Sequence, residues 1–79
     1  MSKLPLCSSA QVEAVLKRLG FKEVKRGKGS HRPYAKVSKD GKVLATVLVL
    51  GKKEIPRGTL KSILELAGIS PEEFIRHLK

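Results

Sequence analysis

The dipeptide Asp40-Gly41 constrains the fold more than any other feature of this sequence. A two-residue type I′ turn needs positive φ at both central positions, which aspartate tolerates and glycine adopts freely. The dipeptide separates the mixed segment Arg32–Ser38 from the almost wholly apolar segment Val43–Leu50. Because both segments suit strands, the sequence predicts an antiparallel β-hairpin here.

The turn also sets the register of this hairpin. If Lys39 faces Lys42, then His31 faces Leu50 at the far end of the two strands. Pro33 has no amide hydrogen for a ladder, so we expect its strand to be irregular near the glycines that precede it. The apolar pattern leaves open which face of the hairpin meets the helices.

A capped helix is predicted before the hairpin. Ser8 and Gln11 form a capping box, and apolar residues follow at helical spacing until Gly20, which suits the C′ position. The next segment, Phe21–Arg26, is predicted to be a short strand that ends at glycines.

The last third of the chain is predicted to form two helices. The first begins near Gly58 or Thr59 and ends at Gly68, while the second begins at Ser70-Pro71-Glu72-Glu73, which places a cap, an N1 proline and an N3 carboxylate in their preferred positions. The predicted apolar faces are Leu60, Ile63, Leu64 and Ala67 in the first helix, and Phe74, Ile75 and Leu78 in the second.

The resulting order, α-β-β-β-α-α, predicts an α+β fold. Three meandering antiparallel strands do not cover their own faces, so the helices should pack on one face and leave the other to solvent or a partner. A chain of 79 residues is expected to form one domain, over residues 1–79, with a compact core.

The charge distribution favours an anionic partner. The net charge is +10, and the segment from Lys17 to Lys42 carries ten cations against Glu23 and Asp40. This excess is greater than solubility requires, so we favour nucleic acid over a merely solvated face, while an anionic protein would suit the same surface. With three aromatic residues, binding should depend on phosphate contacts. The expected RNA-binding side chains are Lys22, Lys25, Arg26 and Lys36.

The sequence disfavours a zinc site, a signal peptide and a transmembrane segment. A single cysteine, Cys7, excludes a disulfide within the chain and, with only two histidines, disfavours a zinc site. The segment Met1–Cys7 is too short for a signal peptide, and no segment approaches transmembrane length. We therefore expect a cytoplasmic protein with no metal, no small-molecule cofactor and no membrane partner.

The motif Gly27-Lys28-Gly29-Ser30-His31 holds the candidate catalytic group. Histidine has the ordinary pKa nearest to neutrality, so it can accept or donate a proton during phosphodiester cleavage. Glycines let a backbone approach a phosphate closely, and a serine adds a hydroxyl donor. The alternative interpretation is a surface histidine at the start of a strand.

The segment Leu64–Ile75 also resembles a helix-turn-helix, with a glycine in the turn. Its second helix begins with Glu72 and Glu73, which would repel DNA and are well explained as a helix cap. A DNA-binding protein that uses Arg76 and Lys79 is therefore the less favoured alternative.

Three stretches of the chain together resemble the HicA (YcfA-like) family of mRNA interferase toxins, over essentially the whole length. They are Leu16–Phe21, Lys28–His31, and Gly58–Leu64 continued by Ala67–Ser70. The resemblance implies a small double-stranded-RNA-binding-like fold, metal-independent cleavage of mRNA, and a HicB antitoxin as the partner in a type II toxin-antitoxin pair.

By position, the resemblance implies that His31 is the catalytic residue and that Gly29 and Ser30 shape its loop. Lys28 and Arg32, its nearest cationic neighbours in the sequence, are the expected phosphate ligands. Many members of the family have a second histidine in a Pro-x-His segment that ends the third strand, where this chain has Leu48-Val49-Leu50. A non-catalytic RNA-binding module of the same fold is the main alternative.

Overall fold

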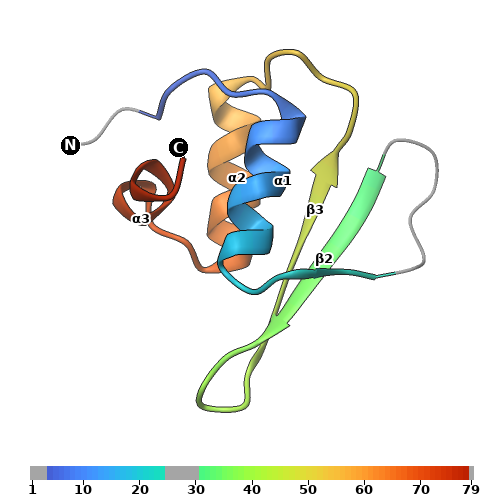
Figure 1. Cartoon of the computed structure of the whole chain (residues 1–79), viewed down its shortest axis with the longest axis vertical. Helices are drawn as coiled ribbons and strands as arrows, with labels where there is room; N and C mark the ends of the chain where they lie inside the picture. Colours follow the sequence, from blue (N-terminus) through green and yellow to red (C-terminus); the bar gives the residue numbers. More distant parts are fainter. Residues whose placement is uncertain (1–3, 25–30, 79) are drawn as a thin grey trace.

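The computed structural model describes residues 4–24 and 31–78 (Figure 1). The elements follow the predicted order, with a helix, three strands and two further helices. Their bounds are α1 Ser9–Arg18, β1 Lys22–Glu23, β2 His31–Val37, β3 Val43–Val49, α2 Arg57–Ala67 and α3 Pro71–Arg76. The protein therefore has an α+β fold.

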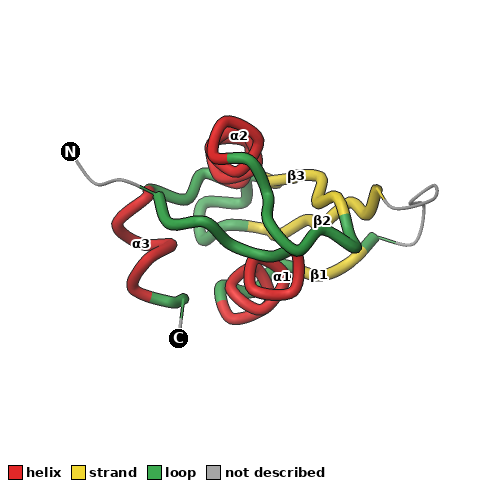
Figure 2. Tube along the Cα trace, turned by 90° about the horizontal axis from the view of Figure 1, so that it is seen from above, coloured by secondary structure: helices red, strands yellow, loops and turns green. Residues whose placement is uncertain are grey.

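The strands form one antiparallel sheet in the order β1-β2-β3, so β2 is central within the described part of the chain. Figure 1 shows α1 and α2 on the same side of β2 and β3, as predicted, and Figure 2 shows α2 toward β3 and α1 toward β1. The sheet thus has an inner face, toward the helices, and an outer face, which no helix in residues 4–24 or 31–78 covers.

The predicted register of the hairpin was wrong by one residue. Val37 pairs with Val43, and His31 pairs with Val49 instead of Leu50. The turn has three residues, because the Ser38 amide donates to the Lys42 carbonyl at 2.8 Å. Within it, Gly41 has a φ of +86° and no other residue of the turn has a positive φ. A three-residue turn that ends in a glycine of positive φ is also a common hairpin connection, and the dipeptide Asp-Gly suits it as well as it suits a type I′ turn.

Two further predictions concern the strands β1 and β2. Within the described residues, β1 covers Lys22–Glu23 and does not include Phe21 or Val24, although the Val24 amide still donates to the Pro33 carbonyl at 2.9 Å. The predicted end of this strand, at Lys25 and Arg26, lies outside the described residues.

Pro33 lies inside β2, which runs without a break from His31 to Val37. The glycines near which an irregularity was expected lie outside the described residues. The Pro33 nitrogen points toward β1, where the described ladder is ending, so the missing amide hydrogen breaks no bond to β3.

The helix caps largely follow the sequence. Ser8 and Gln11 form the reciprocal capping box of α1, and Gly68 closes α2 with a φ of +70°. However, α2 begins at Arg57, earlier than the predicted start near Gly58 or Thr59. The Pro56 carbonyl accepts the first helical hydrogen bond, from the Leu60 amide.

The third helix begins as predicted, since the Ser70 hydroxyl accepts from the Glu73 amide at 3.1 Å. Its apolar side is narrower than predicted. Phe74 is fully buried, whereas Ile75 is exposed. Adjacent residues lie about 100° apart around a helix, so a six-residue helix directs only one of this pair into the core.

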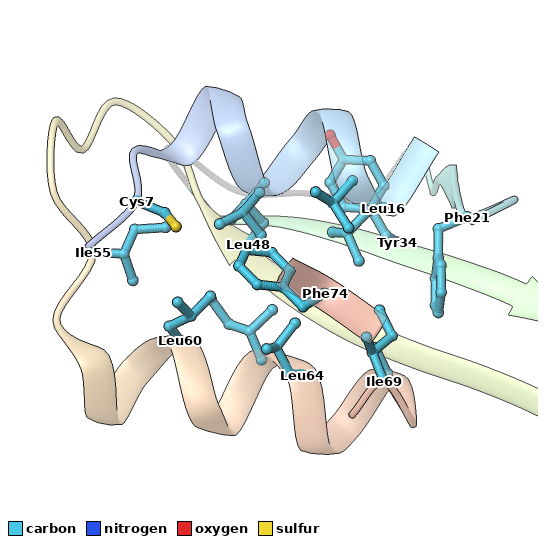
Figure 3. Packing of buried hydrophobic residues seen from close by; sticks show 14 of the residues in the cluster. Cys7, Leu16, Phe21, Tyr34, Leu48, Ile55, Leu60, Leu64, Ile69 and Phe74 are labelled. Carbon is cyan, nitrogen blue, oxygen red and sulfur yellow. The ribbon is translucent and has the colours of Figure 1, made fainter. Parts of the chain in front are cut away.

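One hydrophobic core lies between the helices and the inner face of the sheet (Figure 3). All four residues predicted for the apolar face of α2 are buried in it. Tyr34, Thr46 and Leu48 contribute the inner face of the sheet, and Phe74 enters from α3. No helix in the described ranges is long and apolar enough to cross a membrane.

Candidate nucleic-acid interface

His31 is exposed at the first position of β2, on the outer face of the sheet. Its orientation follows from strand alternation: Tyr34 is buried against the helices, so His31, three residues away, points to the opposite side. Directly across β3 lies Val49. The imidazole is therefore accessible to a large substrate from the side without helices.

The position at which the resemblance implies a second histidine does not face His31. Leu50 occupies that position, just beyond the end of β3, and its partly buried side chain packs against the hydrophobic core. The sequence had placed Leu50 opposite His31, and this placement fails with the one-residue shift of the register.

Two of the predicted RNA-binding lysines meet at a shallow hollow at the other end of β2. Lys22 and Lys36 both line this hollow, which has a volume of about 450 Å³. The Lys36 ammonium lies 5.7 Å from the centre of the Phe21 ring, an arrangement that holds a cation by its attraction to the ring face. The other lining residues are Gly20, Ala35, Val37 and Val43.

The hollow and His31 lie at opposite ends of the same strand. Five residues separate His31 from Lys36, which corresponds to about 17 Å along an extended strand. The structure therefore does not bring Lys22 and Lys36 to the imidazole. They are placed to hold a different part of an extended substrate.

Arg32 lies next to His31 in the chain but on the inner side of the sheet. Its Nε atom is 3.1 Å from a carboxylate oxygen of Glu23, and both side chains are partly exposed. An ion pair of this kind contributes little to stability. Its main effect is to hold the guanidinium group at the edge of the sheet, beside the end that carries His31.

The contact between Tyr34 and Glu13 was not foreseen from the sequence. The buried Tyr34 hydroxyl donates a hydrogen bond to the Glu13 carboxylate, which in turn lies 3.9 Å from the Lys17 ammonium. Burial, and next the Glu13 carboxylate, raise the pKa of Tyr34 from 10.0 to about 12. This bond fixes α1 against β2 behind the outer face, and no local motif could have revealed a pair 21 residues apart.

The remaining predicted site residues, Lys25, Arg26, Lys28, Gly29 and Ser30, lie outside the described residues. Within residues 4–24 and 31–78, no three His, Cys, Asp or Glu side chains gather as a group that could hold a metal ion.

The structure gives little support to the helix-turn-helix interpretation, in which α3 would contact DNA. Phe74 anchors α3 in the core, and the first turn of α3 carries Glu72 and Glu73. His77 ends the helix, and its carbonyl accepts a hydrogen bond from Arg18 of α1 at 2.9 Å. The third helix therefore packs as part of the fold.

Comparison with known proteins agrees with this arrangement. Residues 9–69 match the sequence model of a family described as the HicA toxin of bacterial toxin-antitoxin. The match runs from the first residue of α1 past the end of α2, and so includes the whole sheet and His31. No curated protein matches the chain significantly.

Proposed function

The chain belongs to the HicA toxin family of bacterial toxin-antitoxin systems, and on this premise we propose that it is an endoribonuclease that cleaves mRNA in the cytoplasm. His31 acts as the general base, the reaction uses no metal cofactor, and a HicB-type antitoxin neutralises the protein. The observation that carries the proposal is the exposure of His31 on the helix-free face of a strongly basic protein.

The proposed reaction uses the ribose of the substrate as its nucleophile. The imidazole of His31 takes the proton of a 2′-hydroxyl, and the oxygen attacks the adjacent phosphorus. The bond from phosphorus to the 5′-oxygen breaks, and that oxygen leaves with a proton from water. The products are a 2′,3′-cyclic phosphate and a 5′-hydroxyl end.

Cations hold the substrate at two places in this proposal. Near His31, Arg32 is the proposed ligand of the reacting phosphate: its Nε atom pairs with Glu23, and a guanidinium carries five N–H donors in all. Farther along β2, Lys22 and Lys36 bind a second phosphate at the hollow. The proposed ligands outside the described residues are Lys25, Arg26 and Lys28, with Gly29 and Ser30 shaping the loop.

A second candidate function is a non-catalytic RNA-binding module on the same face. The observation that favours it is Leu50, because the resemblance implies a histidine at this position and this chain has an apolar side chain there, packed against the core. Such a module would retain RNA without cutting it.

Cleavage of a structured mRNA in the presence of EDTA separates these functions. The wild type and His31→Ala should bind the RNA similarly, but His31→Ala should cleave about 10²- to 10⁴-fold more slowly. The matched control is His77→Ala, which removes the other histidine of the chain, at the end of α3, and should cleave like the wild type.

Each alternative has its own result in this experiment. Binding without cleavage by the wild type would support the RNA-binding module. Undiminished cleavage by His31→Ala would refute the role of His31. A shift of duplex DNA that is lost in Arg76→Ala but kept in Lys22→Ala would support the helix-turn-helix interpretation.

The nature of the nucleophile can be tested separately. If the 2′-hydroxyl attacks, an RNA in which every ribose carries a 2′-O-methyl group should bind but remain intact. Cleavage of this RNA would contradict the proposed reaction while leaving the nuclease activity itself in place.

A further inference from the structure

The strand β3 lies at one edge of the sheet, and its free side displays backbone groups. Its even-numbered residues bond to β2, as the pairing of Ser38 with Lys42 establishes. The peptide groups of Val43, Ala45 and Val47 therefore point away from β2, and they have no hydrogen-bond partner among residues 4–24 and 31–78. At the end of the strand, the Val49 carbonyl accepts from the Ser9 hydroxyl at 2.6 Å.

The same residues carry exposed apolar side chains on the outer face. Val43 is 68% exposed and Val47 is 42% exposed, and the exposed Val37 of β2 adds a third valine, paired with Val43. Proteins usually protect an edge strand with a charge, a proline or a bulge. The segment Val43–Val49 contains none of the three.

Lysines flank this uncharged edge at both ends. Lys42 directly precedes β3, and Lys52 and Lys53 follow it closely. A second copy of the chain, which also carries a net charge of +10, would bring its own lysines to the same place. The charge pattern instead suits a strand with an apolar centre and acidic ends.

We propose that the edge of β3 binds an extended segment of the antitoxin, which adds a fourth strand to the sheet. The segment pairs with the peptide groups of Val43, Ala45 and Val47, places apolar side chains beside the exposed valines, and sets acidic residues against the flanking lysines. The proposal rests on membership of a toxin-antitoxin family and does not depend on the chemistry assigned to His31.

The position of this strand would also explain inhibition. Neighbouring strands lie about 4.8 Å apart, so the added strand would run about 10 Å from β2. One of its ends would lie beside Val49, which is paired with His31. An antitoxin anchored there can cover the face that RNA must reach.

Two variants of β3 test the proposal against the purified antitoxin by calorimetry. Ala45→Pro removes an amide hydrogen that faces the free edge, and Val47→Lys adds a charge to it; each should weaken binding by roughly tenfold or more. The matched control Leu66→Lys replaces an apolar side chain of α2 that is also exposed and should bind like the wild type. Thermal unfolding of each variant confirms that it is folded.

Hydrogen exchange of the wild-type complex gives a second measurement. The amides of Val43, Ala45 and Val47 should become protected when the antitoxin binds. Unchanged exchange at these amides, or unchanged affinity of both β3 variants, would overturn the proposal. So would a dimer of the chain alone that Ala45→Pro dissociates, because the occupant would then be a second copy.

The same variants distinguish this proposal from the nuclease proposal. Ala45→Pro, which leaves the charge of the outer face unchanged, should cleave RNA at the wild-type rate but resist the antitoxin. Val47→Lys adds a cation to the face that RNA reaches, so it should keep cleavage and likewise resist the antitoxin. If the wild type cleaves no RNA, the nuclease proposal fails while the binding result stands. If the two variants lose RNA and keep the antitoxin, β3 is an RNA site and the present proposal fails.

Discussion

The two faces of the β2–β3 hairpin differ in almost every respect, although each strand contributes alternate residues to both. On the inner face, Tyr34, Thr46 and Leu48 are fully buried or nearly so, under α1 and α2. On the outer face, His31 and Val47 are exposed to solvent. One hairpin therefore supplies stability with one set of side chains and leaves the other set for binding.

The polar groups of the inner face show how this division is maintained. The Thr46 hydroxyl donates to the Ile63 carbonyl of α2 at 2.8 Å, and the Tyr34 hydroxyl donates to Glu13 of α1. Buried polar groups need such partners. Each of the two bonds joins the sheet to one helix, so both bonds stabilise the packing and neither reaches the outer face.

Adjacent residues of β3 provide the largest expected contrast. Leu48→Ala leaves a cavity in the core and should lower the free energy of unfolding by about 2–5 kcal/mol. Val47→Ala, one residue earlier on the outer face, should change it by about 0.5 kcal/mol or less. Urea unfolding of both variants measures the contrast, and equal losses would show that the outer face is also packed.

A smaller effect should appear at alkaline pH. The pKa of Tyr34 is raised from 10.0 to about 12 in the folded protein, so the neutral hydroxyl stabilises the fold fully below pH 10. This contribution is lost as the pH rises through about 12. The stabilisation lost is about 1.4 kcal/mol for each unit of difference between the folded and the unfolded pKa. The advantage of the wild type over Tyr34→Phe should therefore shrink between pH 8 and pH 11.

Unfolding of both proteins at the two pH values tests this directly. Lysines ordinarily titrate in the same pH range, but they are common to both proteins, so their contribution cancels in the difference between the two free energies of unfolding. A difference between the proteins that stays constant with pH would contradict the assigned role of the buried hydroxyl.

A substitution in the turn should lower the free energy of unfolding by less than the changes at Leu48 and Tyr34. Gly41 has a φ of +86°, and a Cβ there would meet no atom within 4 Å. Gly41→Ala should therefore cost about 1 kcal/mol through backbone strain alone. Gly58→Ala, at a helical position that is equally open, should not destabilise the protein. A larger loss for Gly58→Ala than for Gly41→Ala would contradict this account of the turn.

Local signals in the sequence predicted much of the fold. The capping box at Ser8 and the glycine at Gly68 identified ends of two helices, and the apolar spacing of α2 identified its buried face. These features depend on residues a few positions apart, so their physics is contained in short segments.

The register of the β2–β3 hairpin was predicted wrongly for a physical reason. Asp-Gly suits both a two-residue and a three-residue turn. An apolar pattern normally selects between registers, but Val43–Val49 is apolar at nearly every position, including those on the outer face. The sequence thus identified His31 as the candidate base yet gave it the wrong neighbour, Leu50 in place of Val49.

The cleavage rate of His31→Ala tests the central claim most directly, because the claim assigns the chemical step to a side chain that is exposed to solvent. His31→Ala should unfold within about 0.5 kcal/mol of the wild type. At the same time, its rate of RNA cleavage should fall by about 10²- to 10⁴-fold. A folded His31→Ala protein that cleaves RNA at the wild-type rate would contradict the account.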